Sequence, residues 1–273
     1  MEERFFKFKC FAILSKFPGI IHGVSTRNYG DMKFGRRPDA VQRTELCPEE
    51  GSAPAGKLTD EEIIKNRQQF FQELGVKMNE VVVARLAHGT KITNVGREEK
   101  GRGTTSLESA IQHTDGLVTT QKQVYLMVTV ADCIPIFAYD PVVQAVGLFH
   151  AGWRGIIDQI GPKIMEKFKN LGAEPANLTL AIGPGICQKH FVVKDEVLTK
   201  FKEFYPSATF VRNHDGYVDL KKAILFDLKK EGVVKNNIEV ASDCPFCQNG
   251  VYGSFRKEGN KAPASAAIIG MKQ

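Results

Sequence analysis

Three side chains able to bind a metal or to act as nucleophile and base lie at the ends of apolar runs. Cys133 stands between the runs 124–130 and 134–138, His150 ends the next run and opens into the sequence HAGWRG, and His88 ends an earlier one. A thiolate and two imidazoles suit zinc, and three protein ligands leave a fourth position for water or substrate. Such a metal would activate water or polarise a substrate. These residues are therefore our candidate catalytic and metal-binding set.

Other interpretations of the same residues stay open. The separations of 45 residues (133 − 88) and 17 residues (150 − 133) match no zinc-finger pattern, and a free cysteine is often packed as a small buried hydrophobe. A cysteine hydrolase would use Cys133 as nucleophile and His150 or His88 as base. A copper-dependent phenol oxidase would require more histidines, arranged in paired motifs, than the six scattered histidines of this chain. A non-enzymatic zinc-binding interaction module would dock its partner through the region 31–58.

Two arginines are candidates for holding a phosphate group of a substrate. Arg27 follows an apolar run, and Arg154 lies in the GWRG sequence directly after His150. Arginine binds phosphate through paired charge-assisted hydrogen bonds. Neither GxxxxGK[ST] nor GxGxxG occurs in the chain, so the common nucleotide-binding loops are not indicated.

The remaining cysteines and histidines carry weaker signals. Cys244 and Cys247 form a CxxC pair, which is compatible with half of a zinc knuckle, a redox pair or two packed thiols; without a second CxxC, packed thiols are favoured. Asp132 lies on the expected strand, so we expect it to point away from Cys133. We interpret three further cysteines as incidental: Cys10, Cys47 and Cys187. We interpret four further histidines as surface residues or as core residues with a satisfied hydrogen bond: His22, His113, His190 and His214.

Apolar patterns and turn signals predict the elements that position these residues. Thr59 and Glu62 have capping-box spacing at the start of a helix that ends near Gly75, and Gly161-Pro162 kinks or starts another helix. Asp195 is expected to cap a helix that ends at Phe204, and Asp219 one that ends at about Glu231. Expected strands are 5–14 (one or two), 20–26, 80–87, 116–120, 124–130, 134–138, 178–182, 191–193, 238–241, 251–256 and 264–271.

Strands and helices interleave without a repeat or a linker. We predict an α+β fold in which packed mixed β-sheets are flanked by helices, in a single domain 1–273 with an irregular surface loop at about 31–58.

Composition excludes several classes of protein. The hydrophobic fraction of 42% and charged fraction of 25% are typical of globular proteins, and the net charge of +6 is not gathered into a basic block that would indicate nucleic-acid binding. No apolar run approaches the roughly 18 residues of a membrane span, and no secretory signal is recognisable. Six cysteines without a disulfide framework favour a reducing compartment, so we expect a cytoplasmic protein.

Several motifs together resemble the YfiH-like laccase-domain family, once labelled polyphenol oxidases and later described as purine nucleoside phosphorylases. The motifs are LAHGTKI, ADCIPIFAYDP, FHAGWRG, AIGPGICQKHFVV, DCPFCQNGVYGSFRKEGN and VSTRNYG. Leu86 stands where the family pattern has Gln, and residues 31–58 replace the family's usual NLG…GD segment.

The resemblance implies a fold, a metal and an activity. The fold would be YfiH-like, similar to cytotoxic necrotizing factor, with zinc held by Cys133, His88 and His150. The activity would be phosphorolysis of adenosine, inosine, guanosine and methylthioadenosine, with adenosine deamination besides. The partners would be purine nucleosides and phosphate. Copper would be a less suitable metal than zinc. The protein would be a monomer or homodimer.

Overall fold

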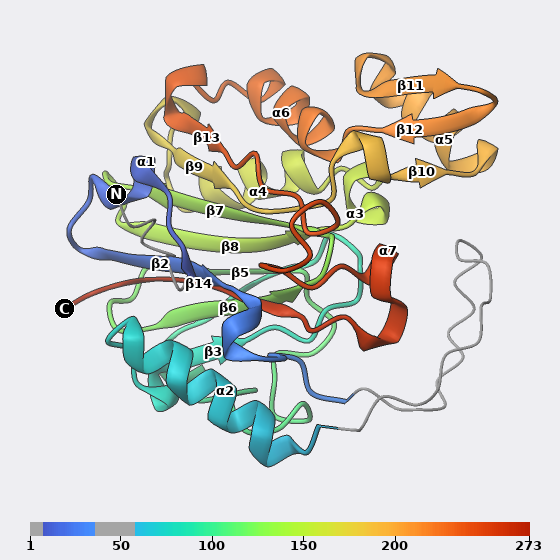
Figure 1. Cartoon of the computed structure of the whole chain (residues 1–273). Helices are drawn as coiled ribbons and strands as arrows, with labels where there is room; N and C mark the ends of the chain where they lie inside the picture. Colours follow the sequence, from blue (N-terminus) through green and yellow to red (C-terminus); the bar gives the residue numbers. More distant parts are fainter. Residues whose placement is uncertain (1–7, 36–57) are drawn as a thin grey trace, which may run out of the picture.

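The computed structural model describes residues 8–35 and 58–273, and two mixed β-sheets packed face to face form the centre of this part of the chain (Figure 1). The expected irregular loop 31–58 lies mostly outside the described residues, and its first part, 31–35, has no regular structure. Within the described ranges, the five-stranded sheet has the order β1 (Phe8–Lys9), β2 (Ile20–Ser25), β14 (Ser265–Met271), β6 (Tyr125–Val130) and β3 (Val81–Val83). The six-stranded sheet, in the same part of the chain, has the order β13 (Ile238–Val240), β9 (Thr179–Ile182), β7 (Ile134–Asp140), β8 (Ala145–Ala151), β5 (Gly116–Thr119) and β4 (Ile92–Asn94).

The central strands are continuous apolar runs because both of their faces are buried. Along β6, Leu126 and Val128 belong to the core between the two sheets, whereas Tyr125 and Met127 pack on the outer side of the five-stranded sheet. Successive strand residues point to opposite faces, so a run without polar alternation can fill two cores at once. The predicted strands at 124–130 and 134–138 are thereby confirmed.

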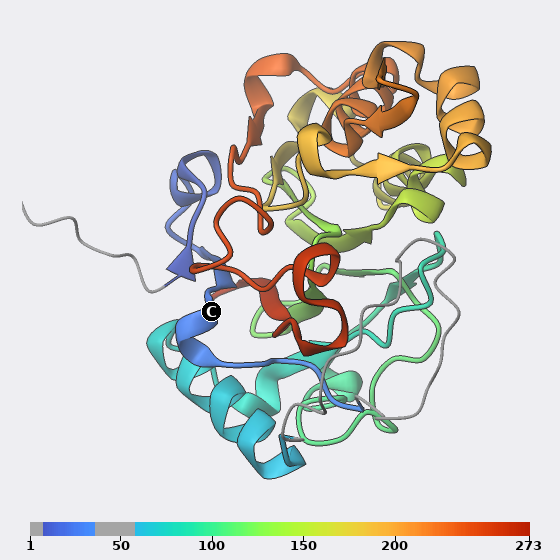
Figure 2. The same cartoon turned by 45° about the vertical axis from the view of Figure 1, so that its right-hand side comes forward.

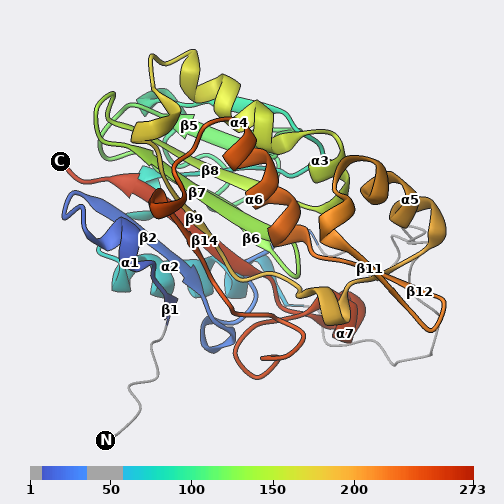
Figure 3. The ribbon, with the colours of Figure 1, turned by 90° about the horizontal axis from the view of Figure 1, so that it is seen from above.

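Helices cover the outer faces of both sheets. Helix α2 (Asp60–Glu73) lies below the five-stranded sheet, where Phe70 and Phe71 join its outer core, and the capping box between Thr59 and Glu62 is present as predicted. Seen from above, α4 (Ile160–Lys169) and α6 (Leu220–Lys230) lie over the six-stranded sheet (Figure 3). The predicted cap Asp219 accepts a hydrogen bond from the N–H of Lys222 (3.0 Å). At one end, α5 (Asp195–Phe204) packs beside a small sheet of β10 (Val192–Val193), β12 (Asp215–Val218) and β11 (Thr209–Arg212). The predicted cap Asp195 is corrected, because it is the first residue of α5 and the N-cap position is Lys194.

The helical region after Trp153 is two helices instead of one. Helix α3 (Trp153–Ile157) ends before Gln159, whose φ of 66° is left-handed, and α4 begins at the next residue. The break precedes Gly161 by two residues, so Gly161-Pro162 belongs to the first turn of α4, where proline is tolerated. This agrees with the expectation that this pair lies near a helix start.

Two predicted strands are corrected. Residues 251–256 form a turn followed by α7 (Phe255–Glu258), whose first turn is capped because Ser254 Oγ accepts from the N–H of Lys257. Within 8–14, only β1 is a strand, and α1 (Ala12–Ser15) is a short helix. In 251–256 the alternating residues Tyr252 and Ser254 are buried from a turn, and in 8–14 Phe11, Ile13 and Leu14 are buried at and within α1; a sequence pattern cannot distinguish such burial from that of a strand.

The architecture is the mixed arrangement of packed sheets and flanking helices that the sequence predicts. In the described ranges no helix has both the length and the apolar character needed to cross a bilayer.

Candidate functional site

The sheet topology gathers His88, Cys133 and His150 at one end of the six-stranded sheet. Cys133 lies in the turn that carries the chain from β6 in one sheet to β7 in the other. Because β7 and β8 are antiparallel and Pro135 pairs with His150, the start of β7 lies beside the end of β8. His88 comes from the loop between β3 and β4. Cys133 and His150 thus lie just before and on neighbouring strands, as the sequence indicates.

One possible ligand atom from each of these three residues lies within 4.8 Å of the others. The rings of His88 and His150 meet edge to face, with centroids 4.8 Å apart. Gly152 leaves the space that these side chains share, since a Cβ there would lie 3.3 Å from Cys133 Sγ, 3.5 Å from His150 Cε1 and 3.6 Å from His88 Cδ2. A thiol and two imidazoles that converge on a space kept free by glycine fit a zinc ion with one open coordination position.

Asp115, a residue that sequence reasoning did not single out, organises the site from behind. Its Oδ1 accepts from the N–H of His88 (2.8 Å) and lies 3.0 Å from His150 Nδ1, while its Oδ2 accepts from the N–H of Gly89 (2.8 Å) and of Ala87 (3.2 Å). The Asp115 carbonyl also accepts from the N–H of His150 (2.7 Å). A carboxylate behind a ligating histidine fixes its tautomer and orientation. His150 is therefore left with Nε2 as its free ligand atom.

The electrostatics favour a carboxylate at Asp115 and a thiolate at Cys133. Burial acts to raise the pKa of Asp115, but His150 and the N–H groups of Gly89 and His88 outweigh it and lower the pKa. Burial also acts to raise the pKa of Cys133, and the adjacent His150 and His88 rings lower it. Burial would lower the pKa of His150, but Cys133 and Asp115 raise it. A thiolate is the form of cysteine that binds metals and attacks electrophiles.

Two residues of the site have an uncommon left-handed backbone. His88 has φ 60° and Asp132 has φ 76°. Both residue types are enriched in this region of backbone conformation. At Asp132 the turn sends the carboxylate away from the cluster, where it accepts from Ser254 Oγ (2.8 Å) and from the N–H of Arg256 (2.6 Å). Asp132 is therefore in a turn and not on a strand, which corrects the expectation, although its side chain does point away.

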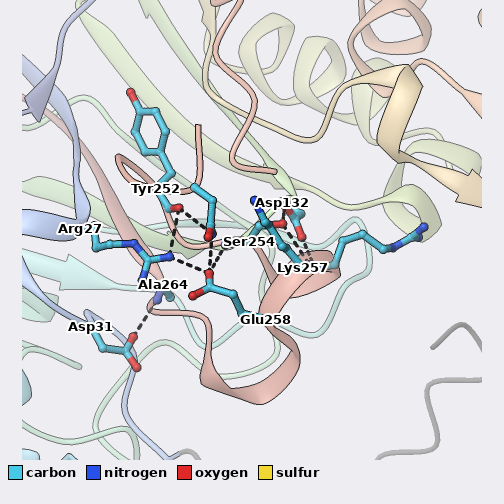
Figure 4. A network of polar contacts seen from close by, with 10 residues as sticks. Arg27, Asp31, Asp132, Tyr252, Ser254, Lys257, Glu258 and Ala264 are labelled. Atoms are coloured by element: carbon cyan, nitrogen blue, oxygen red, sulfur yellow. Dashed lines mark hydrogen bonds and ion pairs between the residues drawn. The ribbon is translucent and has the colours of Figure 1, made fainter. Parts of the chain in front are cut away.

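A segment near the C-terminus, residues 241–264, contacts Asp132, the residue that precedes Cys133. Figure 2 shows its α7 part lying between the α2 side and the α5 side of the molecule. In the close-up, Ser254 reaches Asp132 while Glu258 reaches Arg27 (Figure 4). The 241–264 segment therefore holds the residue next to Cys133 and one of the predicted phosphate ligands.

The two predicted phosphate ligands differ in how they are held. Arg27 Nη2 donates to Glu258 Oε2 (2.6 Å) and, at 3.4 Å, to the Tyr252 carbonyl, while its Nε is buried without a hydrogen-bond partner among the described residues. The guanidinium of Arg154 is exposed, lying 4.4 Å over the Trp153 ring. The structure thus engages Arg27 and leaves Arg154 accessible at the start of α3.

A second cluster of possible metal ligands brings together cysteines and a histidine that the sequence did not connect. The CxxC pair Cys244 and Cys247 lies against Cys187 and His190, with one possible ligand atom from each residue within 4.8 Å of the others. Cys187 and His190, interpreted above as incidental, surface or core residues, thus lie together with the CxxC pair. The signal that identifies them is their own spacing, since CxxH has the same interval as CxxC. His22, in contrast, is a core histidine as expected, accepting at Nε2 from the N–H of Phe11 (2.9 Å).

The comparisons with known proteins identify the family of this chain. The sequence model of the family described as multi-copper polyphenol oxidoreductase laccase matches residues 56–272. A protein named purine nucleoside phosphorylase YlmD from Bacillus subtilis is 29% identical over 219 residues, covering 78% of this chain and 79% of the relative. One named adenosine deaminase RL5, from an unknown prokaryotic organism, is 30% identical over 202 residues, covering 72% of this chain and 77% of the relative.

Solved structures show the same fold. YfiH from Bacillus licheniformis superposes with a TM-score of 0.84 at 24% identity, covering 97% of this chain and 99% of that one. YlmD from Geobacillus stearothermophilus also gives a TM-score of 0.84, at 23% identity, covering 98% and 99%. The fold class predicted from the sequence is confirmed, and the chain belongs to the YfiH-like laccase-domain family.

Proposed function

We propose that this protein is a zinc-dependent purine nucleoside phosphorylase, acting on adenosine, inosine, guanosine and methylthioadenosine, with adenosine deaminase activity besides. The observation that carries the proposal is the convergence of His88, Cys133 and His150 on one space with Asp115 behind them. Relatives named for these two activities support the choice of nucleosides as substrates.

The donor set favours zinc over copper. One thiolate and two imidazoles suit zinc, and three ligands leave the position that a catalytic metal needs. The family description speaks of several coppers, but the chain contains six histidines, and His22 is engaged in the core. When bound, zinc supplies a Lewis acid at the open position for phosphate, water or the purine.

The residues of the chain prepare this position before any substrate arrives. Asp115 fixes a proton on Nδ1 of His150, so that the Nε2 lone pair points into the shared space. It also holds the N–H groups of His88 and Gly89, which fixes the loop that carries the second imidazole. Gly152 keeps the space open. Preorganised groups of this kind need no rearrangement during the reaction.

Phosphorolysis would use the exposed arginine beside the site. An oxygen of phosphate bonds to C1′ while the bond from C1′ to the purine nitrogen breaks, and the base leaves with the electron pair and takes up a proton. Arg154 is accessible for the charge-assisted hydrogen bonds that hold phosphate. The guanidinium of Arg27 already donates to Glu258, so fewer of its N–H groups are available to a phosphate. We therefore assign Arg154 the main phosphate contact and Arg27 a supporting one. In deamination, water adds at C6 and ammonia leaves.

We place this activity in the cytoplasm, in a monomer or homodimer. The described cysteines are all free thiols, which is the state that a reducing compartment maintains.

The test is product analysis with matched variants. Purified protein is incubated with inosine or adenosine, with and without phosphate, and free base, ribose 1-phosphate and ammonia are measured. The proposal predicts phosphate-dependent release of base from inosine and ammonia from adenosine, both lost in Cys133→Ala and after chelation. The exposed thiol Cys10, replaced in Cys10→Ala, serves as the control. Failure of the metal-loaded protein to act on either nucleoside would overturn the proposal.

A second candidate function rests on the order of contacts Cys133, His150, Asp115. A thiol next to an imidazole that is next to a carboxylate is the arrangement of a cysteine hydrolase, in which Asp115 would orient the base His150. It predicts turnover of an ester or amide without metal and covalent trapping of Cys133 by iodoacetamide. The non-enzymatic alternative depends on the loop 31–58, most of which lies outside the described residues.

A further inference from the structure

A second group of metal-ligand side chains lies apart from the site described above. It joins the short 3₁₀ turn before β10 to the 241–264 segment, and it consists of Cys187, His190, Cys244 and Cys247, called here the Cys3His cluster. Each half of the cluster is a local pair three residues apart, CxxH and CxxC. Such pairs are the usual halves of structural zinc sites.

The distances within the cluster match a tetrahedron around one ion. Cys187 Sγ lies 3.3 Å from His190 Nδ1 and 3.8 Å from Cys247 Sγ. Cys247 Sγ lies 3.4 Å from the same nitrogen. Donors placed tetrahedrally at zinc–sulfur and zinc–nitrogen bond lengths of about 2.3 and 2.05 Å are about 3.5–3.8 Å from one another. A disulfide needs its sulfurs at about 2.05 Å, so Cys187 Sγ and Cys247 Sγ, 3.8 Å apart, are not bonded to each other and both sulfurs are available to a metal.

The surroundings orient the ligands. The N–H of Cys187 donates to Cys244 Sγ (3.2 Å), and this sulfur is almost fully buried. The His190 ring stacks on Phe246, with centroids 4.1 Å apart and planes 16° from parallel, which keeps Nδ1 directed at the thiols. Contacts of this kind hold metal ligands in place and select the coordinating nitrogen.

The charge around the cluster is also appropriate. Three thiolates with one zinc ion leave one net negative charge, and lysines surround it. The charges of Lys189 and Lys257 act on His190, and those of Cys187 and Cys244 act on Lys221.

We propose that the Cys3His cluster binds one structural zinc ion, separate from the metal of the His88, Cys133 and His150 site. All four positions are filled by protein, which is typical of structural and not catalytic zinc. The ion anchors the 241–264 segment to the turn before β10, where Arg256 also donates to the Val192 carbonyl (2.9 Å). That segment supplies Ser254 to Asp132 and Glu258 to Arg27. The second ion therefore stabilises the wall of the first site.

Metal analysis tests the proposal without reference to activity. Zinc per chain is measured in the wild type and in Cys247→Ala, His190→Ala, Cys133→Ala and the control Cys10→Ala. Cys247 is exposed, so its replacement leaves the core intact. We expect Cys247→Ala and His190→Ala to hold one equivalent less than the wild type, and Cys10→Ala to equal it. Equal zinc in Cys247→Ala and the wild type would overturn the proposal.

A second measurement tests the proposal without substituting any residue of the Cys3His cluster, so it remains valid if the cluster variants do not fold. Cys133→Ala, reconstituted with Co²⁺, isolates the Cys3His cluster as the source of any thiolate-to-cobalt charge-transfer absorption. Strong bands of this type, with the intense visible absorption of tetrahedral cobalt, are expected. A Cys133→Ala protein that binds cobalt without them, or that forms a disulfide within the cluster in place of binding cobalt, refutes the structural site. Neither result depends on whether the protein acts on nucleosides.

Discussion

Asp115 Oδ1 lies 3.0 Å from His150 Nδ1 and accepts from the backbone N–H of His88 at 2.8 Å, so one buried carboxylate orients the His150 ring and holds the backbone that carries the His88 ring. The two histidines come from a strand and a loop that are otherwise independent. Their common partner explains how ligands 62 residues apart (150 − 88) hold a fixed relative position.

Replacing Asp115 by Asn is expected to weaken metal binding at the first site about 10- to 100-fold, the usual effect of losing the partner of a ligating histidine. In the variant one of the two acceptor oxygens becomes an N–H₂ group, so either His150 Nδ1 and the N–H of His88 or the N–H groups of Gly89 and Ala87 lose their acceptor. Competition with a chromogenic chelator measures the affinity. Asp140 is the matched control, because it is buried and its Oδ1 accepts from the N–H groups of Val142 and Val143 at the other end of β7. Equal losses in Asp115→Asn and Asp140→Asn would contradict a specific role.

Gly152→Ala should lower kcat/KM about tenfold while leaving the fold intact, because small misplacement of catalytic groups is costly. The added Cβ would lie 3.3 Å from Cys133 Sγ, so the sulfur has to shift by a few tenths of an ångström. Gly19→Ala is the control, since a Cβ there meets no atom within 4 Å. Steady-state kinetics with inosine and a circular dichroism melt separate the two effects. Unchanged kinetics in Gly152→Ala would show that the space is not used.

Arg154→Ala should raise the KM for phosphate about 10- to 100-fold, because a charge-assisted hydrogen bond contributes roughly 1.5–3 kcal/mol. Adenosine deamination, which consumes no phosphate, should change little. Arg154→Lys should recover part of the effect, and Arg212→Ala, an exposed arginine on β11, should have none. If deamination and phosphorolysis fall together in Arg154→Ala, the residue acts on the whole site and not on phosphate.

Asp227 predicts a pH dependence of stability that is separate from the active site. Burial raises its pKa to about 6, and Tyr205, Lys230 and Glu231 modify it. The Tyr205 hydroxyl donates to Asp227 Oδ2 at 2.8 Å when the carboxyl is ionised. When Asp227 is protonated, its O–H can donate to Tyr205 Oη instead, which frees the Tyr205 hydroxyl to donate to the Ile156 carbonyl. The folded state therefore binds more protons than the unfolded state between about pH 4 and pH 6. The resulting stabilisation is present at low pH and is lost as the pH rises through about 6.

The matched variant is Asp227→Asn, whose amide donates to Tyr205 at every pH. Relative to this variant, the wild type should lose about 1–3 kcal/mol of unfolding free energy between pH 4 and pH 7, with no further change above pH 7. Urea unfolding at several pH values measures the difference. A difference independent of pH would exclude the titration of Asp227.

The sequence predicts what is local and leaves out what only the fold brings together. Capping by Thr59 and Asp219 and the apolar runs of β6 and β7 are written in neighbouring residues, so these elements are recognisable in advance. Asp115 is not, because nothing in the chain indicates which acidic residue lies behind a histidine 35 residues away. The segment 251–256 misleads because buried Tyr252 and Ser254 alternate as in a strand while the chain turns towards α7.

The two clusters show the same limit. His88, Cys133 and His150 can be proposed from their types and family motifs, but their proximity depends on the crossover between the sheets. Cys244 and Cys247 look like half a site, and the CxxH pair that begins 57 residues earlier at Cys187 has the matching spacing, but only the fold shows that the turn before β10 lies beside them.

The most direct measurement is inosine phosphorolysis followed through removal and return of zinc. Wild-type protein is stripped with a chelator, reconstituted with zinc or with copper, and assayed for ribose 1-phosphate beside Cys133→Ala treated in the same way. The account predicts phosphate-dependent product from the zinc-loaded wild type, little from the stripped or copper-loaded protein, and none from Cys133→Ala. Full phosphorolysis by the stripped protein, or by zinc-loaded Cys133→Ala, would contradict it.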